Sequence, residues 1–148
     1  MPKVKFVIVG RNATMQIRRL VSAEKSIKLL GYVQNPVPFI QKATVFVVPI
    51  RSGGGTRLKV LEAMSTGKAV VTTKLGCEGI PGKDGVHFVI ADEANEFSDA
   101  IMKLVRNPGL RNRIGKNARQ FVVDRYDWKK ITKKLNTAYY EIYSSSKR

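Results

Sequence analysis

RSGGGTRLKVLEAMSTG, residues 51–67, is the stretch around which the rest of the chain is organised. It follows an apolar run, VFVVP at residues 45–49, and its three glycines precede apolar residues at helical spacing. Thr56 is a good helix N-cap residue, and Gly67 stands where a left-handed residue would end a helix of about three turns. This order of strand, glycine loop and helix is how α/β proteins present backbone N–H groups to a phosphate.

Three charged residues on the predicted helix bear on what the loop binds. Arg57 and Lys59 fall in the first turn, where a cation is unfavourable by about 0.3–1 kcal/mol unless an anion is bound. Glu62 follows one turn later, and because helical side chains lean toward the N-terminus, its carboxylate would reach back toward the loop and could accept hydrogen bonds from ribose hydroxyls. Two interpretations stay open from these residues: a nucleoside diphosphate site, or a strand-to-helix turn with surface cations.

The composition places the chain among ordinary globular domains. Its 148 residues are 43% hydrophobic and 26% charged, enough for one domain with a core. No apolar run approaches the roughly 20 residues of a membrane span, and the N-terminal MPKVKFVIVG is not typical of a signal peptide, so we expect a cytoplasmic protein. The only cysteine, Cys77, excludes an internal disulfide, and the only histidine, His87, is expected to be structural. We find no cluster of metal ligands and expect no metal.

The net charge of +16, from 27 Lys and Arg against 11 Asp and Glu, indicates an anionic partner. The excess extends to residues 101–148, where basic residues greatly outnumber Asp124, Asp127 and Glu141. Two interpretations stay open, a solvated helical face or a surface that docks on an anionic membrane. Nucleic acid is not favoured, because the tyrosines at positions 139, 140 and 143 are expected to pack rather than to stack on bases.

The order of the predicted elements indicates the fold class. Apolar runs predict strands at residues 5–10, 27–33, 45–49, 69–73 and 86–91. Helices are expected after Asn12 as cap, at residues 39–43, after the glycine loop, and at residues 93–106, 110–123 and 128–143. The last helix carries Ile131, Leu135, Ala138 and Ile142 on one stripe. The alternation predicts an α/β fold with a doubly wound parallel sheet, in which ligands bind beyond the carboxyl ends of the strands.

Together these motifs resemble the C-terminal, donor-binding domain of GT-B-fold glycosyltransferases of family 4, also called group 1. Almost the whole chain takes part, through KFVIVG, IKLLGYVQN, ATVFVVPIRSGGGTRLKVLEAMSTGKAVVTTKLGCEGI and NPGLRNRIGKNARQFVVDRYDW. The resemblance implies a Rossmann-like half of a GT-B fold with a helical C-terminal region. It also implies that residues 1–148 form a single nucleotide-sugar-binding domain, without the family's first strand and N-terminal acceptor domain.

The resemblance assigns roles only to matching positions. Glu62 matches the second signature glutamate of the family, which holds the ribose hydroxyls, whereas Gly54 stands at the first, whose carboxylate contacts the donor sugar in many members. Residues 56–58 match the segment whose backbone amides hold the diphosphate, and residues 32–33 match the loop that flanks the nucleobase. The substrate-binding residues implied are Tyr32, Val33, Gly53, Gly54, Gly55, Thr56, Arg57, Leu58, Lys59 and Glu62.

The activity implied is transfer of a sugar from a nucleoside-diphosphate sugar to an acceptor hydroxyl, in polysaccharide biosynthesis, with no cofactor. No catalytic residue is identified. The implied partners are the nucleotide sugar and an N-terminal acceptor domain in the same or another chain. The net charge adds a further expected partner, the inner face of the membrane, contacted through basic helices. We expect the chain to be inactive alone, because it has one wall of the cleft and lacks the family's basic pair, which stabilises the leaving diphosphate. The alternative is a non-catalytic basic Rossmann-like module that binds nucleic acid or anionic membrane.

Overall fold

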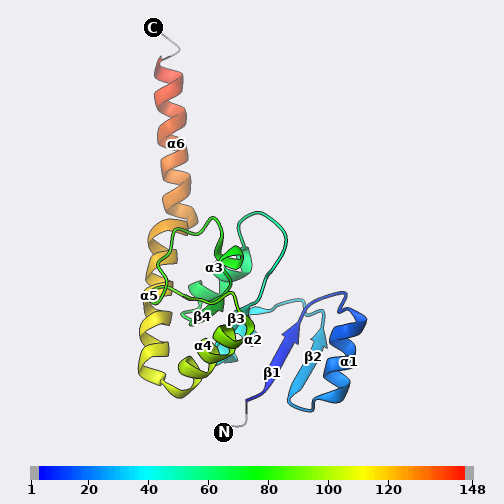
Figure 1. The fold of residues 1–148 in the computed structure, drawn as a ribbon. Helices are drawn as coiled ribbons and strands as arrows, with labels where there is room; N and C mark the ends of the chain where they lie inside the picture. The colour runs from blue at the N-terminus through cyan, green and yellow to red at the C-terminus, as the bar shows by residue number, and fades with distance from the viewer. Residues whose placement is uncertain (1–3, 146–148) are drawn as a thin grey trace. The chain divides into compact units, whose positions relative to one another are not determined.

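The computed structural model describes residues 4–145 (Figure 1), and the chain divides into two compact units, Met1–Pro38 and Phe39–Arg148. The strands are β1 (Phe6–Val9), β2 (Ile27–Gly31), β3 (Phe46–Val48), β4 (Val70–Thr72) and β5 (Val89–Ile90). The helices are α1 (Met15–Ala23), α2 (Val37–Lys42), α3 (Leu58–Ser65), the 3₁₀ helix η1 (Leu75–Cys77), α4 (Ala94–Arg106), α5 (Pro108–Tyr126) and α6 (Trp128–Ser145).

The first unit is a βαβ arrangement. β1 pairs in parallel with β2, with Phe6 opposite Ile27, and α1 connects them. The cap of α1 is Thr14, whose side chain accepts a hydrogen bond from the N–H of Ile17 at 3.4 Å. The prediction that Asn12 caps this helix is wrong. Asn12 adopts a left-handed φ of 56°, which asparagine tolerates in turns, two residues before the extended Thr14.

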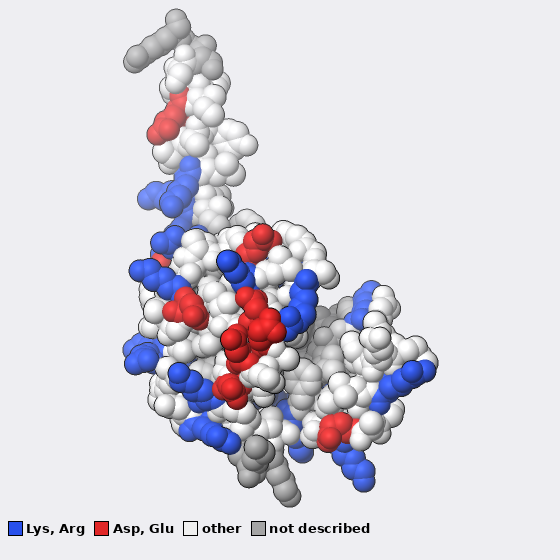
Figure 2. Space-filling model, viewed as in Figure 1, with Lys and Arg blue, Asp and Glu red and all other residues white. Residues whose placement is uncertain are grey.

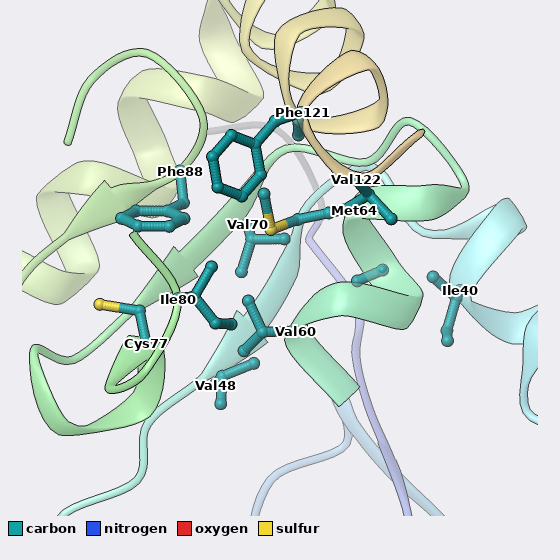
Figure 3. Packing of buried hydrophobic residues seen from close by; sticks show 12 residues of the cluster. Ile40, Val48, Val60, Met64, Val70, Cys77, Ile80, Phe88, Phe121 and Val122 are labelled. Carbon is teal, nitrogen blue, oxygen red and sulfur yellow. The ribbon is translucent and has the colours of Figure 1, made fainter. Parts of the chain in front are cut away.

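The second unit carries the parallel sheet β3-β4-β5, with helices on both faces. Because side chains alternate along a strand, Val70 packs with α3 and α5 while Val71 packs on the opposite side with α4. Figure 3 shows the hydrophobic cluster on the Val70 side of the sheet, in which Met64 and Phe121 lie close to Val70. Parallel strands covered by helices on both faces confirm the predicted α/β class.

α3 differs from its prediction at one end and agrees at the other. It has eight residues, about two turns, and its N-cap is Arg57, which makes no side-chain capping bond. The prediction that Thr56 is the cap is wrong. The chain at Thr56 still belongs to the loop, and its hydroxyl oxygen lies where a Cβ on Gly79 would come within 2.9 Å. At the other end Gly67 has a φ of 75°, which confirms the predicted left-handed end of the helix.

The C-terminal helices follow one another closely. Asn107 caps α5 by accepting a hydrogen bond from the N–H of Leu110 at 2.9 Å, and Pro108 occupies the first helical position. α6 follows after Asp127, and none of its residues is buried. The prediction that its tyrosines pack is wrong for Tyr139 and Tyr140, whose exposed fractions are 64% and 74%, and Tyr143 is 61% exposed.

Candidate functional site

The glycine loop, residues 51–57, begins at the carboxyl end of β3 and leads into α3. Gly53 and Gly55 have φ values of 105° and 82°, in the left-handed region where only glycine fits without strain. The loop is exposed, and it lies at the edge where parallel sheets bind their ligands. Two of its three glycines are therefore required by the backbone conformation of the loop.

The backbone N–H groups of residues 53–59 are free to bind a ligand. None of them donates a hydrogen bond within residues 4–145. Leu58 and Lys59 are the first residues of α3, so their N–H groups have no partner inside the helix. Such a row of donors at the start of a helix favours an anion.

Arg57 lies folded over this loop. Its Nη1 atom donates a hydrogen bond to the carbonyl oxygen of Gly54 at 2.8 Å, and a Cβ on Gly53 would lie 3.3 Å from Nη2. The Nε and Nη2 atoms are buried and have no hydrogen-bond partner in the described chain. Because buried donors without acceptors are costly, this guanidinium group would gain from an incoming anion that rearranges the loop.

Thr73, which follows β4, holds the start of the loop. Its hydroxyl donates a hydrogen bond to the carbonyl oxygen of Ile50 and accepts one from the N–H of Gly76 at 2.9 Å. One side chain thereby joins the segment after β3 to η1. No role is predicted for Thr73 from the sequence, although its position at the carboxyl end of a strand is a signal for one.

Asp92, which follows β5, makes a second connection at the same edge. Its carbonyl oxygen accepts a hydrogen bond from Nη2 of Arg51 at 2.6 Å, and its Oδ1 atom accepts one from the N–H of Lys74 at 2.9 Å. The segments that follow β3, β4 and β5 are therefore joined by Asp92 and Thr73. No role is predicted for Asp92 from the sequence either, because its hydrogen-bond partners are 41 and 18 residues away in the chain.

Glu62 lies on the exposed face of α3, opposite to the side where Val60, Ala63 and Met64 are buried. Its carboxylate makes no hydrogen bond or ion pair within residues 4–145, where the one ion pair joins Lys130 to Asp124. The carboxylate is accordingly free to accept hydrogen bonds from a ligand. The structure brings Glu62 and residues 53–59 together on one loop and the helix that follows it.

Tyr32 and Val33 belong to the first unit and are described on their own. Tyr32 is 60% exposed, and the guanidinium carbon of Arg11 lies 3.8 Å from the centre of its ring. Val33 is half-buried. An exposed ring with a stacked cation can also stack on an aromatic ligand. The role of Tyr32 and Val33 beside a nucleobase stays a prediction.

The only cysteine and the only histidine have structural surroundings. Cys77 is buried, and burial raises the pKa of its thiol, which disfavours the reactive thiolate. The Nδ1 atom of His87 accepts a hydrogen bond from the N–H of Lys83 at 2.9 Å, and its ring lies 4.6 Å from that of Phe121. Across residues 4–145, no three His, Cys, Asp or Glu side chains are grouped as a metal site would require. Nor does that part of the chain hold a helix long and apolar enough to cross a bilayer.

Comparison with known proteins identifies a family, several relatives and solved structures of similar fold. Residues 1–107 match the model of the family described as glycosyl transferases group 1. A phosphatidyl-myo-inositol mannosyltransferase of Mycobacterium leprae is 28% identical over 150 residues, which cover 98% of this chain and 40% of that enzyme. The crystal structure of Anabaena Alr3699/HepE in complex with UDP has a TM-score of 0.85 at 19% identity, covering 95% of this chain and 42% of that one.

A further relative, the 44.6 kDa protein in the cps region of Klebsiella pneumoniae, is 34% identical over 87 residues, which cover 59% of this chain and 22% of that protein. The chain therefore spans less than half the length of the curated relatives it matches. The structural likeness confirms the predicted fold, a Rossmann-like half of a GT-B fold with C-terminal helices.

Proposed function

This chain belongs to the group 1 glycosyl transferases, and we propose on that basis that it binds the nucleoside-diphosphate sugar from which the enzyme transfers a sugar to an acceptor hydroxyl. The observation that carries the proposal is the row of unpaired N–H groups at residues 53–59, next to the partly unpaired guanidinium group of Arg57. Proteins with a known structure of the same fold support it, since Alr3699/HepE was crystallised with UDP.

The proposed chemistry depends on where negative charge develops. As the bond between sugar and diphosphate breaks, charge builds on the leaving diphosphate, and donors already aimed there stabilise the transition state more than the ground state. The N–H groups of residues 53–59 supply such donors, and Arg57 adds a positive charge. Glu62 accepts hydrogen bonds from the ribose hydroxyls, and Tyr32 with Val33 flanks the nucleobase. The substrate carries the transferable group, so the proposal includes no cofactor.

The proposal assigns the rest of the active site to another part of the protein. The chain covers 22% to 40% of the length of the curated relatives it matches, and the acceptor side of the cleft lies in the remainder or in another chain. Holding two reactants in the correct geometry lowers the activation barrier by about 7–11 kcal/mol in favourable cases. Without this positioning we expect no detectable sugar transfer by these 148 residues. We propose that they form a single donor-binding domain and that the protein acts in the cytoplasm.

Titration calorimetry with UDP, GDP and ADP tests this function. We expect one of the three to bind and to keep most of its affinity as salt rises from low to moderate, because hydrogen bonds to N–H groups and Glu62 are short-ranged. Heparin serves as the matched polyanion. If heparin binds in low salt only and none of the nucleotides binds, the chain is a basic module without a nucleotide site, and the proposal is wrong.

A sugar-transfer assay tests the claim about the missing part. These 148 residues and the full reading frame are compared with a panel of nucleotide sugars. Turnover is expected only from the full protein. Turnover by the 148 residues alone would show that the chain holds a complete active site.

A further inference from the structure

A turn at the end of η1 lies against the glycine loop. The N–H of Ile80 donates a hydrogen bond to the carbonyl oxygen of Cys77 at 3.0 Å, Glu78 has φ −54° and ψ 136°, and Gly79 has a φ of 76°. These four residues form a type II turn, with Glu78 and Gly79 at its tip. A Cβ on Gly79 would come within 2.9 Å of the hydroxyl oxygen of Thr56. The tip of the turn therefore touches the loop that carries the unpaired N–H groups.

The core fixes this turn at both ends. Cys77 and Ile80 are 7% and 6% exposed, and Figure 3 shows Ile80 next to Val60 of α3. Before the turn, the hydroxyl of Thr73 joins the segment after β3 to η1. The place of Glu78 beside the glycine loop is accordingly set by the packing of the second unit.

Glu78 carries a carboxylate that has no partner in the described chain. The residue is exposed, and its carboxylate makes no hydrogen bond or ion pair within residues 4–145. The chain has 27 Lys and Arg against 11 Asp and Glu, and Figure 2 shows basic side chains spread over both units on the face in view. A carboxylate that stays unpaired in so basic a chain is available to a ligand.

The glycine loop and the first turn of α3 supply hydrogen-bond donors but no carboxylate, since residues 51–59 contain no Asp or Glu. Space for a ligand is open above the loop, because a Cβ on Gly54 or Gly55 would meet no atom within 4 Å. The Cα atom of Glu78 lies about 3.8 Å from that of Gly79, the residue that touches the loop. The carboxylate of Glu78 is therefore within reach of a group bound there.

We infer that the carboxylate of Glu78 accepts hydrogen bonds from hydroxyl groups of the transferred sugar, and that this sugar is neutral. The inference rests on the proposed function, in which the diphosphate binds residues 53–59. Sugar hydroxyls are donors, and an ionised carboxylate accepts through both of its oxygens. A uronic acid would bring a second negative charge next to Glu78, and two like charges repel each other.

The contribution of the sugar is measured by comparing a nucleoside diphosphate with its hexose conjugate. Calorimetry on the whole chain compares UDP with UDP-glucose, GDP with GDP-mannose, and ADP with ADP-glucose. In Glu78→Gln we expect unchanged affinity for the diphosphate that binds and about tenfold weaker binding of its hexose conjugate, because a neutral amide is a weaker acceptor than a carboxylate. Equal losses for both ligands, or no loss for either, would overturn the inference.

Glu93→Gln is the matched control, because it makes the same change of charge at the same edge of the sheet. Glu93 is exposed, and its side chain makes no capping bond to α4. This variant should keep the affinity for the hexose conjugate. A loss in Glu93→Gln but not in Glu78→Gln would place the acceptor after β5 and contradict the assignment. Thermal unfolding checks that both variants keep the stability of the unsubstituted chain.

The charge of the sugar gives an independent test. UDP-glucuronate should bind more weakly than UDP-glucose, or GDP-mannuronate more weakly than GDP-mannose, and Glu78→Gln should narrow the difference. Tighter binding of the uronate would show that the net charge of +16 dominates, and would overturn the inference. If none of the three nucleoside diphosphates binds, the proposed function fails and the inference with it. If one binds and Glu78→Gln has no effect on its hexose conjugate, this inference alone fails.

Discussion

The Nη1 atom of Arg57 donates a hydrogen bond to the carbonyl oxygen of Gly54 at 2.8 Å, while Nε and Nη2 of the same guanidinium group stay buried without a partner in residues 4–145. The side chain at the N-cap of α3 is thus partly used to hold the loop that precedes it. A diphosphate bound at this loop would supply the missing acceptors.

Glu62→Gln should lower the affinity for the nucleotide that binds by roughly tenfold or more, because hydrogen bonds to a charged group contribute about 1.5–3 kcal/mol. The melting temperature should stay unchanged, since Glu62 is exposed and its carboxylate makes no hydrogen bond or ion pair in the described chain. Calorimetry and thermal unfolding measure the two effects. Asp99→Asn, on the exposed side of α4, is the control. Unchanged affinity with a lowered melting temperature would make Glu62 a structural residue.

Gly55→Ala should destabilise the loop while Gly54→Ala should not. No atom lies within 4 Å of a Cβ at either position, but Gly55 has a φ of 82° and Gly54 lies outside the left-handed region. A side chain in that region costs about 1–2 kcal/mol. Urea unfolding should show this difference between the two variants. Equal stability would mean that the loop has no fixed left-handed residue at Gly55.

Gly115→Ala should destabilise the fold strongly because α5 approaches the end of α3 at this position. A Cβ on Gly115 would lie 2.1 Å from the carbonyl oxygen of Gly67 and 3.4 Å from the nitrogen of Ala69. Overpacking of this kind typically costs about 1–3 kcal/mol, measured by urea unfolding. Gly109→Ala, in the first turn of α5, meets only Asn107 at 3.5 Å and should be nearly neutral. A neutral Gly115→Ala would show that the two helices can move apart easily.

His87 should make the stability depend on pH. Burial, and then the charges of Lys83 and Arg125, lower its pKa in the folded chain below the usual 6.5. Between the lowered pKa and 6.5 the unfolded chain binds more protons, so the free energy of unfolding falls as pH falls through this window and is fully recovered above it. His87→Asn removes the titration and should flatten this slope.

Urea unfolding between about pH 5 and 8 measures the effect of His87, because this is the range in which histidine titrates. Asp124, whose pKa is lowered from 3.8 by its hydrogen bonds to Gln120 and Lys130, titrates below this range. It therefore does not interfere. An unchanged slope in the His87→Asn variant would assign the pH dependence to another group.

Local patterns predicted most of the second unit. The strands β3 and β4 and the left-handed Gly67 follow from an apolar run and from a glycine after a helix, both of which depend on neighbouring residues. The cap of α3 could not be predicted in this way. Thr56 suits a cap by type, but its hydroxyl lies beside Gly79, which is 23 residues away in the chain, and a local pattern does not show such a neighbour.

The sequence pattern predicts the backbone N–H donors of the candidate site. It does not predict the side chains that hold the glycine loop in place. Gly53 and Gly55 and the first N–H groups of α3 are contiguous, so the order of elements is enough to find them. The contacts of Asp92 with Arg51 and Lys74 join three separate strands and leave no periodic signal. For α6 the hydrophobic periodicity predicts the apolar stripe, but periodicity does not show what the stripe packs against. In the described chain the large side chains of this stripe are exposed.

An NMR titration of the ¹⁵N-labelled chain with UDP, GDP and ADP shows whether the N–H groups of residues 53–59 bind a nucleotide, because it reports on each backbone N–H group separately. We expect one of these nucleotides to shift the signals of Gly53 to Lys59 and of Glu62 more strongly than any others in the second unit, with Tyr32 and Val33 shifting in the first. Shifts confined to the lysines of α6, or no saturable shifts with any of the three nucleotides, would contradict this expectation.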